Sequence, residues 1–250
     1  MQKKIKFTII SPAFNARDGI EKTYESVRMQ QDADWEYLVI DGMSTDGSQE
    51  QYALWEREDD NFRFVSEKDA GIYDAMNKGT KLATGDYVLF LGAGDCLANE
   101  FVLKDMKEVI KKENPDICYG YVMFCHSDEK KEVYCRKIDK TYPFRADPIS
   151  HQAVFARVGL LKENPFDLHY RIAADQDWIM KMYKGKRRFL YADVTVADYD
   201  MAGVSATKEG KKAGAAELRQ IHKKYYPLYY LVHEMLRRIN KMTFKYKRVS

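Results

Sequence analysis

Two aspartates lie at the ends of apolar runs, where a carboxylate lowers stability unless it makes specific contacts. Asp41 and Asp95 each end an apolar run that is long enough for a buried β-strand. A carboxylate at such a place destabilises the fold unless it caps a helix, pairs with a donor or binds a ligand. For a single aspartate of this kind, a helix cap or an Asx turn is the commoner role. Two of them at one edge of a sheet favour a functional site.

The runs around these aspartates predict a parallel sheet. Four of them lack polar alternation and are each followed by a helical pattern; they span residues 6–11, 35–41, 62–65 and 87–91. Such strands are typical of an α/β sheet that helices cover on both faces, and its ligands bind outside the carboxyl ends of the strands. At that edge we expect residues 12–15, Asp41, residues 67–69 and Asp95.

Local signals mark further elements. Asp18 and Glu21 form a capping-box pattern ahead of a helix, and Asn99 is a plausible cap for another. Alternation, turn residues and helical periodicity predict a hairpin over 117–125 and the turn 127–131, a strand over 151–155, a helix after Asp175, and strands over 189–196.

Several functional classes lose support. No Gly-x-Gly-x-x-Gly follows the first strand and no Gly-x-x-x-x-Gly-Lys-Ser/Thr occurs, which disfavours dinucleotide-binding and P-loop proteins. The four cysteines form no Cys-x-x-Cys pair, so reduced thiols are expected rather than a structural metal. No signal-peptide core or apolar run of roughly 20 residues is present, so the expected location is the cytoplasm, with the inner face of the membrane as an alternative.

Charge divides the chain of 250 residues. Residues 208–250 contain 12 Lys and Arg against 3 Asp and Glu, whereas the remainder contains 29 against 35. An acidic globule with a basic C-terminal segment is therefore expected, with the boundary near residue 207.

Four motifs follow one another between Phe7 and Asp95. They read FTIISPAFN (7–15), VIDGMSTDGS (39–48), EKDAGIYDAMNKG (67–79) and GDYVLFLGAGD (85–95). In this order they resemble the motifs of family 2 inverting glycosyltransferases, of the non-processive type that serves bacterial polysaccharide biosynthesis. The resemblance implies a GT-A fold: a nucleotide-sugar-binding half (1–98), an acceptor-binding half (99–207), then a basic loop and amphipathic helices (208–250).

The resemblance also implies roles at the sheet edge. Asp41 would contact the nucleoside of a nucleotide-sugar donor, and Pro12, Phe14 and Asn15 would lie beside the base. Asp95 would hold a divalent metal, Mg²⁺ or Mn²⁺, which offsets the negative charge of a departing nucleoside diphosphate.

Asp69 and Asp74 are further donor-site candidates. With equal weight, Asp69 caps the helix that starts at Ile72, and Asp74 lies in its first turn. Where many members of the family have additional acids, this chain has Gly42 and Ala93.

Residues 171–178 resemble the acidic motif that supplies the catalytic base of the family. Asp175 matches that base, and Ala174 replaces the acid that commonly precedes it. On a helix, Asp175 would share a face with Trp178 and Ile179, turned toward the protein, which suits a proton acceptor. Without the resemblance, a helix N-cap is the commoner role for such an aspartate.

Three further residues are assigned by their place beside these motifs. His151 and Gln152 are expected on the acceptor or diphosphate side, although a lone histidine is more often structural. Asp177 is the second candidate for the base. The expected reaction is a single displacement with inversion, adding one sugar to a glycan or lipid-linked acceptor. The alternative is a nucleotide-sugar-binding module that has lost catalysis.

The basic segment has several interpretations. Residues 203–214 resemble a mobile loop that closes over the donor and brings Lys208, Lys211 and Lys212 to the diphosphate; a solvated linker is the alternative. An apolar stripe over 228–242 beside Arg and Lys predicts a helix at a membrane interface. Packing on its own domain or on a second subunit has equal weight, and nucleic acid ranks last.

Overall fold

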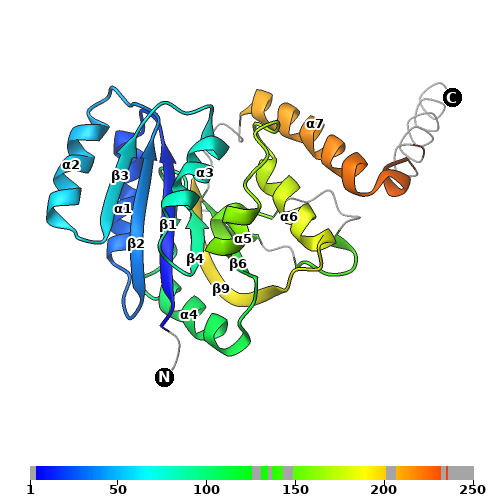
Figure 1. Ribbon diagram of the computed structural model, residues 1–250, viewed down its shortest axis with the longest axis horizontal. Helices are drawn as coiled ribbons and strands as arrows, with labels where there is room; N and C mark the ends of the chain where they lie inside the picture. The colour runs from blue at the N-terminus through cyan, green and yellow to red at the C-terminus, as the bar shows by residue number, and fades with distance from the viewer. Residues whose placement is uncertain are drawn as a thin grey trace.

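The first four predicted strands form and pair in parallel. In the computed structural model, which describes residues 4–125, 131–134, 137–142, 149–200, 207–231 and 235, they lie side by side in the order β3-β2-β1-β4 (Figure 1). Their bounds are β1 Lys6–Ala13, β2 Asp34–Asp41, β3 Phe62–Ser66 and β4 Tyr87–Phe90. The helices between them are α1 Arg17–Arg28, α2 Ser48–Glu58 and α3 Ile72–Leu82.

The second half extends this sheet with mixed strand directions. Within the described residues, the sheet has nine strands in the order β3-β2-β1-β4-β8-β6-β9-β5, with β7 paired to β6. β8 is antiparallel to β4 and to β6, whereas β9 is parallel to β6. The added strands are β5 Cys96–Leu97, β6 Ile117–Cys125, β7 Lys131–Tyr134, β8 Val154–Arg157 and β9 Phe189–Asp200. The remaining helices are α4 Val102–Glu113, α5 Val158–Glu163, α6 Ala174–Lys184 and α7 Lys208–Tyr225.

Two apolar cores lie on the two faces of the sheet. One buries side chains of α1, α2 and α4 against Phe7, Ile9 and other residues of the strands. The other buries α3, α5, α6 and Ile221 of α7 against Ile10, Ile40 and Phe90. Alternate residues of β1 therefore serve opposite cores, as the period of two in a strand requires. The prediction of a sheet covered on both faces is confirmed.

Several local predictions change in the structure. β1 continues through Pro12, because its pairing with β4 ends at Ile10, and beyond that point the strand has a neighbour on one side only. The capping box at Asp18 is wrong: α1 begins after Ala16, and the backbone N–H of Arg17 donates to Asp46 instead. Asn99 is not the N-cap of α4, which is Phe101.

Three later predictions have different outcomes. The hairpin is confirmed by the antiparallel β6–β7 pair, while residues 126–130 of its turn lie outside the described part of the chain. The strand predicted over 151–155 begins instead as a 3₁₀ turn, His151–Ala153, before β8. Residues 208–214 are not a loop: they form the start of α7, whose N-cap Thr207 accepts from the Gly210 N–H, and residues 203–206 lie outside the described chain.

A buried glutamate fastens the amino end of the sheet. Glu36 on β2 accepts hydrogen bonds from the Thr8 hydroxyl (2.6 Å) and from the backbone N–H and hydroxyl of Thr84 (2.7 Å each). Lys6 lies 3.3 Å from the same carboxylate. Burial alone would raise the pKa of Glu36, but the hydrogen bonds from the two threonines and the charge of Lys6 outweigh it and lower the pKa to about 2.

Glu36 therefore makes stability depend on acid pH. A carboxylate with a depressed folded-state pKa stabilises the fold fully above its ordinary value of 4.5, and this contribution is lost as the pH falls toward 2. The difference corresponds to about 3 kcal/mol. We expect Glu36→Gln to be less stable than wild type at pH 7, with a smaller gap at pH 3, in urea unfolding. An equal gap at both values would contradict the assignment.

Candidate active site

The loops after β1 and β2 are tied together at the carboxyl edge of the sheet. The Asn15 N–H donates to the Ser44 hydroxyl (2.8 Å), and the Asn15 side-chain oxygen accepts from the Thr45 N–H (2.9 Å). Asn15 has a positive φ of 48°, a conformation that asparagine tolerates better than most residues. Next to it, the ring of Phe14 is 64% exposed, and Pro12 is half-buried. This double loop therefore presents an aromatic ring to solvent.

The side chain of Asp41 is hydrogen-bonded to the loop after β2 and to the end of β3. Its side chain is fully buried and accepts hydrogen bonds from the Ser44 N–H (3.0 Å), the Ser44 hydroxyl and the Ser66 hydroxyl (2.6 Å). The carboxylate thus joins the end of β2 to the end of β3. Asp41 thereby fixes the loop that contains Ser44 against the end of β3.

Gly42 makes room for Asp69. A Cβ atom at Gly42 would lie 2.9 Å from Asp69 Oδ2 and 3.3 Å from a ring carbon of Phe14. The absence of a side chain therefore allows Asp69 and Phe14 to approach the same point. Asp69 also accepts from the Gly71 N–H (2.9 Å), but it is not the N-cap of α3, which is Gly71.

Asp74 lies in the first turn of α3, as one of the two predictions for it stated. Its Oδ2 accepts from the Ala70 N–H (3.0 Å) and lies 3.4 Å from Lys78 Nζ. These contacts explain Asp74 as part of the helix start.

Asp95 lies in the tight turn between β4 and β5. Its Oδ2 accepts from the Gly92 N–H (2.9 Å) and from the side-chain amide of Gln152 (3.1 Å). Only 3% of Asp95 is exposed. The turn that holds it needs Gly94, whose φ is 103°.

Asp175 lies in the first turn of α6, whose N-cap is Ala173, so the N-cap alternative is wrong. Its Oδ1 accepts from the Tyr73 hydroxyl (3.0 Å) and the Gln176 N–H (2.8 Å). Its Oδ2 lies 3.0 Å from His151 Nδ1. If the histidine donates in this contact, its tautomer carries the proton on Nδ1.

Tyr73 was not predicted from the sequence. Burial, followed by the charge of Asp175, raises its pKa well above 10, so the hydroxyl keeps its proton and can donate. A cavity of about 20 Å³ also borders Asp175, and it is lined mainly by apolar side chains such as Phe90, Phe166 and Trp178. Polar groups therefore contact the Asp175 carboxylate, and mainly apolar side chains line the small cavity beside it.

The turn that contains His151 and Gln152 connects Asp95, the predicted metal ligand, with Asp175, the predicted base. Gln152 donates to Asp95, and its neighbour His151 contacts Asp175. Two consecutive residues therefore bring a carboxylate from the end of β4 and a carboxylate from the start of α6 into one neighbourhood. The 3₁₀ turn allows both side chains to reach the same site, whereas successive side chains of a strand point to opposite faces.

Asp177 faces a different partner. Its carboxylate is 4% exposed and accepts from Lys224 Nζ of α7 at 2.9 Å. Burial acts to lower the pKa of Lys224, but Asp177 outweighs it and raises that pKa above its ordinary range. Asp177 is thus engaged by α7 rather than by the turn of His151 and Gln152.

The metal proposed for Asp95 would need ligands from outside the protein. Among the described residues, no group of three His, Cys, Asp or Glu side chains is placed to hold a metal ion. Mg²⁺ is commonly held by one or two carboxylates together with substrate phosphates and water. A single carboxylate at Asp95 fits that pattern and does not form a cage of its own.

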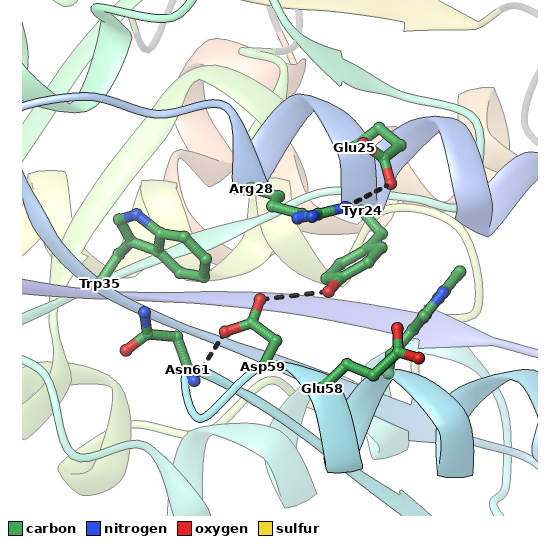
Figure 2. Close-up of a pocket in the computed structure, with 8 residues that line it drawn as sticks. Tyr24, Glu25, Arg28, Trp35, Glu58, Asp59 and Asn61 are labelled. Carbon is green, nitrogen blue, oxygen red and sulfur yellow. Dashed lines mark hydrogen bonds and ion pairs between the residues drawn. The ribbon is translucent and has the colours of Figure 1, made fainter.

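Another cavity, of about 330 Å³, lies at the opposite edge of the sheet. Figure 2 shows Tyr24, Trp35 and Asp59 on its wall, with the Tyr24 hydroxyl donating to Asp59 at 3.1 Å. Trp35 lies near the start of β2, about 20 Å from Asp41 at the end of the same strand, from the rise of a strand. This cavity is therefore separate from the acids of the carboxyl edge.

The fold and the site define a class of protein. A parallel β/α half that continues into a mixed half, with an acid in the turn after the fourth strand, is the GT-A arrangement of glycosyltransferases. The chain belongs to glycosyl transferase family 2, whose model matches residues 8–205. No helix within the described residues is long and apolar enough to cross a membrane.

Relatives and solved structures agree with this assignment. The chain is 32% identical over 206 residues to a PGL/p-HBAD biosynthesis glycosyltransferase of Mycobacterium bovis, covering 80% of this chain and 79% of the relative. S. aureus TarS 1–349 in complex with UDP-GlcNAc has a TM-score of 0.69 at 19% identity, covering 88% and 71%. The mannosyltransferase PcManGT from Pyrobaculum calidifontis, in complex with GDP-Man and Mn²⁺, has a TM-score of 0.62 at 18% identity, covering 93% and 65%. These two structures show the fold.

Proposed function

We propose that this glycosyltransferase moves a sugar from a nucleoside-diphosphate sugar to a hydroxyl group of a glycan or lipid-linked acceptor, with inversion at the anomeric carbon. The supporting observation is the turn of His151 and Gln152, which contacts Asp175 and Asp95 at once. In the proposed reaction, Asp95 would act on the diphosphate side of a donor sugar, and Asp175 on the side of the attacking hydroxyl. The complexes of TarS with UDP-GlcNAc and of PcManGT with GDP-Man support a donor of this class.

Asp175 is the proposed general base. Tyr73 and the Gln176 N–H hold Oδ1, and His151 holds Oδ2, so the carboxylate has one orientation. It would accept the proton of the acceptor hydroxyl while that oxygen attacks the anomeric carbon. The nucleoside diphosphate then leaves from the opposite face. No covalent sugar–enzyme intermediate forms in this reaction.

Residues of the loops after β1, β2 and β4 would bind the donor. Phe14 with Pro12 and Asn15 forms the exposed double loop for the base, and Asp41 holds that loop in place. Asp95 would hold Mg²⁺ or Mn²⁺, as the Mn²⁺ complex of PcManGT suggests. When bound, such an ion offsets the charge that gathers on the diphosphate.

A donor panel tests the proposal. UDP-, GDP- and dTDP-sugars are added with Mn²⁺ or Mg²⁺, and thermal unfolding and release of nucleoside diphosphate are both measured. One donor should stabilise the protein by about 2.7 kcal/mol at 100 times its Kd and should release its diphosphate. Binding without release, across a broad set of acceptors, would favour the non-catalytic module. No stabilisation by any donor would reject the proposal.

Exposed apolar residues that follow α7 support contact with a membrane. After α7, Leu228, Leu231 and Met235 are 79%, 62% and 56% exposed, at spacings that place them on one face of a helix. In the sequence, Lys223 and Lys224 precede this stretch and Arg237 and Arg238 follow it, so an anionic lipid surface matches both the apolar and the charged groups. We infer that a cytoplasmic enzyme docks here on the inner face of the membrane.

Vesicle flotation tests this docking. The wild-type protein should float with vesicles of phosphatidylcholine and phosphatidylglycerol, and the double change Leu228→Asp and Leu231→Asp should reduce flotation several-fold. Leu54→Asp is the matched control, because Leu54 on α2 is exposed to a similar degree (55%). Equal flotation of all three proteins would remove the membrane proposal.

A further inference from the structure

A glutamate of α7 binds the segment that leads into α6. Glu217 Oε1 accepts from the Arg171 N–H, and Oε2 accepts from the N–H groups of Ile172 and Ala173, each at 2.9 Å. The N-cap residue of α6, Ala173, has no side chain that can accept a hydrogen bond. Backbone N–H groups at a helix start need acceptors, and an acid is favoured there by the helix dipole. One carboxylate of a distant helix therefore satisfies three consecutive donors.

The same segment is held from its carbonyl side. The Tyr73 hydroxyl lies 2.7 Å from the Ile172 carbonyl oxygen and 3.0 Å from Asp175 Oδ1, and its single proton is shared between these two acceptors. Glu217 and Tyr73 thus fix residues 171–173 from two directions, immediately before Asp175. A shift of this segment would move the carboxylate of Asp175 relative to its partners His151 and Tyr73.

One face of α7 makes these contacts possible. Gly214, Glu217, Ile221 and Lys224 recur at helical spacing, which places them on the side of α7 that faces α6. A Cβ atom at Gly214 would lie 3.1 Å from Ile172 Cγ2, and Ile221 is fully buried. Lys224 completes the face through its ion pair with Asp177. Figure 1 shows α7 beside α6, as their contacts require.

We propose that Glu217 is a positioning residue for the base Asp175, so that α7 is a working part of the active site. This inference rests on the proposed role of Asp175. It adds a helix that lies outside residues 8–205, the part matched by the family. Part of the basic segment after residue 207, the helix α7, would then contribute to catalysis.

Glu217→Ala and Glu217→Gln test the inference, with Glu209→Ala as the matched control. Glu209 is an exposed acid in the first turn of the same helix. Misplacement of a catalytic group by about 1 Å costs on the order of 100-fold. We expect Glu217→Ala to lower kcat by about 10- to 100-fold at an unchanged donor Kd. Glu217→Gln keeps one carbonyl acceptor and should recover part of the rate, and Glu209→Ala should match wild type.

Hydrogen exchange gives a readout that does not depend on turnover. The amides of residues 171–173 should exchange faster in Glu217→Ala than in wild type, with the strands of the sheet unchanged. Full kcat in a Glu217→Ala protein with faster exchange would overturn the inference, as would unchanged exchange. If Glu217→Ala does not fold, Glu217→Gln decides by the same two measurements. If Asp175→Asn keeps full turnover, the proposed function fails; if Asp175→Asn is inactive and Glu217→Ala is fully active, only this inference fails.

Discussion

Replacing Asp175 with asparagine should lower turnover by roughly 10²- to 10⁴-fold, the usual contribution of a general base. Asparagine has nearly the same shape and keeps one oxygen for Tyr73 and the Gln176 N–H, but it cannot accept the proton of an acceptor hydroxyl. Donor binding should be unchanged. The measurement is release of nucleoside diphosphate with the best donor, alongside the donor Kd.

Asp177→Asn is the control on the same helix. Asp177 is buried like Asp175, but its partner is Lys224. Its loss removes the nearer of the two carboxylates that Lys224 contacts, the other being Asp167 at 3.7 Å, so we expect a lower melting temperature and a retained rate. The opposite pattern, with Asp177→Asn inactive and Asp175→Asn active, would assign the base to Asp177.

Replacing Asp95 with asparagine should remove the metal dependence of donor binding. Without a carboxylate, the stabilisation that Mn²⁺ adds to the donor complex should disappear, and turnover should fall by about 10²- to 10³-fold, equal to several kcal/mol of charge stabilisation. The measurement is thermal unfolding with UDP or GDP, with and without Mn²⁺, and the rate at saturating donor.

Asp105→Asn on the exposed side of α4 controls for the loss of one negative charge. It should keep both the Mn²⁺ effect and the rate. If the Asp95→Asn protein retains the full Mn²⁺-dependent stabilisation, Asp95 does not bind the metal.

The sequence was most informative where burial dictates its pattern. Apolar runs predicted β1 to β4 because these strands are covered on both faces. The rule that ligands bind beyond the carboxyl ends of parallel strands then placed Asp41 and Asp95 at one edge. Periodicity alone gave Asp175 no special role, and its assignment as a base came from the resemblance of the motif.

The structure differs from local prediction where distant residues satisfy a helix end. α1 does not use Asp18, since the Arg17 N–H finds Asp46 in the loop after β2. α6 likewise receives Glu217 from α7. Capping rules consider only neighbours in sequence, so they cannot find an acceptor that the fold brings from another loop or helix.

The role of Gly42 and the turn at His151 could not be predicted from the sequence for a related reason. A glycine after Asp41 has no evident purpose in the sequence, and its reason is the approach of Asp69 in space. Residues 151–155 have the composition of a strand, but contacts to Asp95 and Asp175 accompany a 3₁₀ turn over the first three of them. Both features depend on tertiary contacts.

We propose that Asp95 and Asp175 act on the two sides of one donor sugar. A crystal structure of the full chain with its donor and Mn²⁺ tests it most directly. We expect the ion bound to Asp95 and the diphosphate, with the Asp175 carboxylate facing the anomeric carbon from the side opposite the leaving group. A donor whose sugar lies away from Asp175, or an ion held without Asp95, would contradict it.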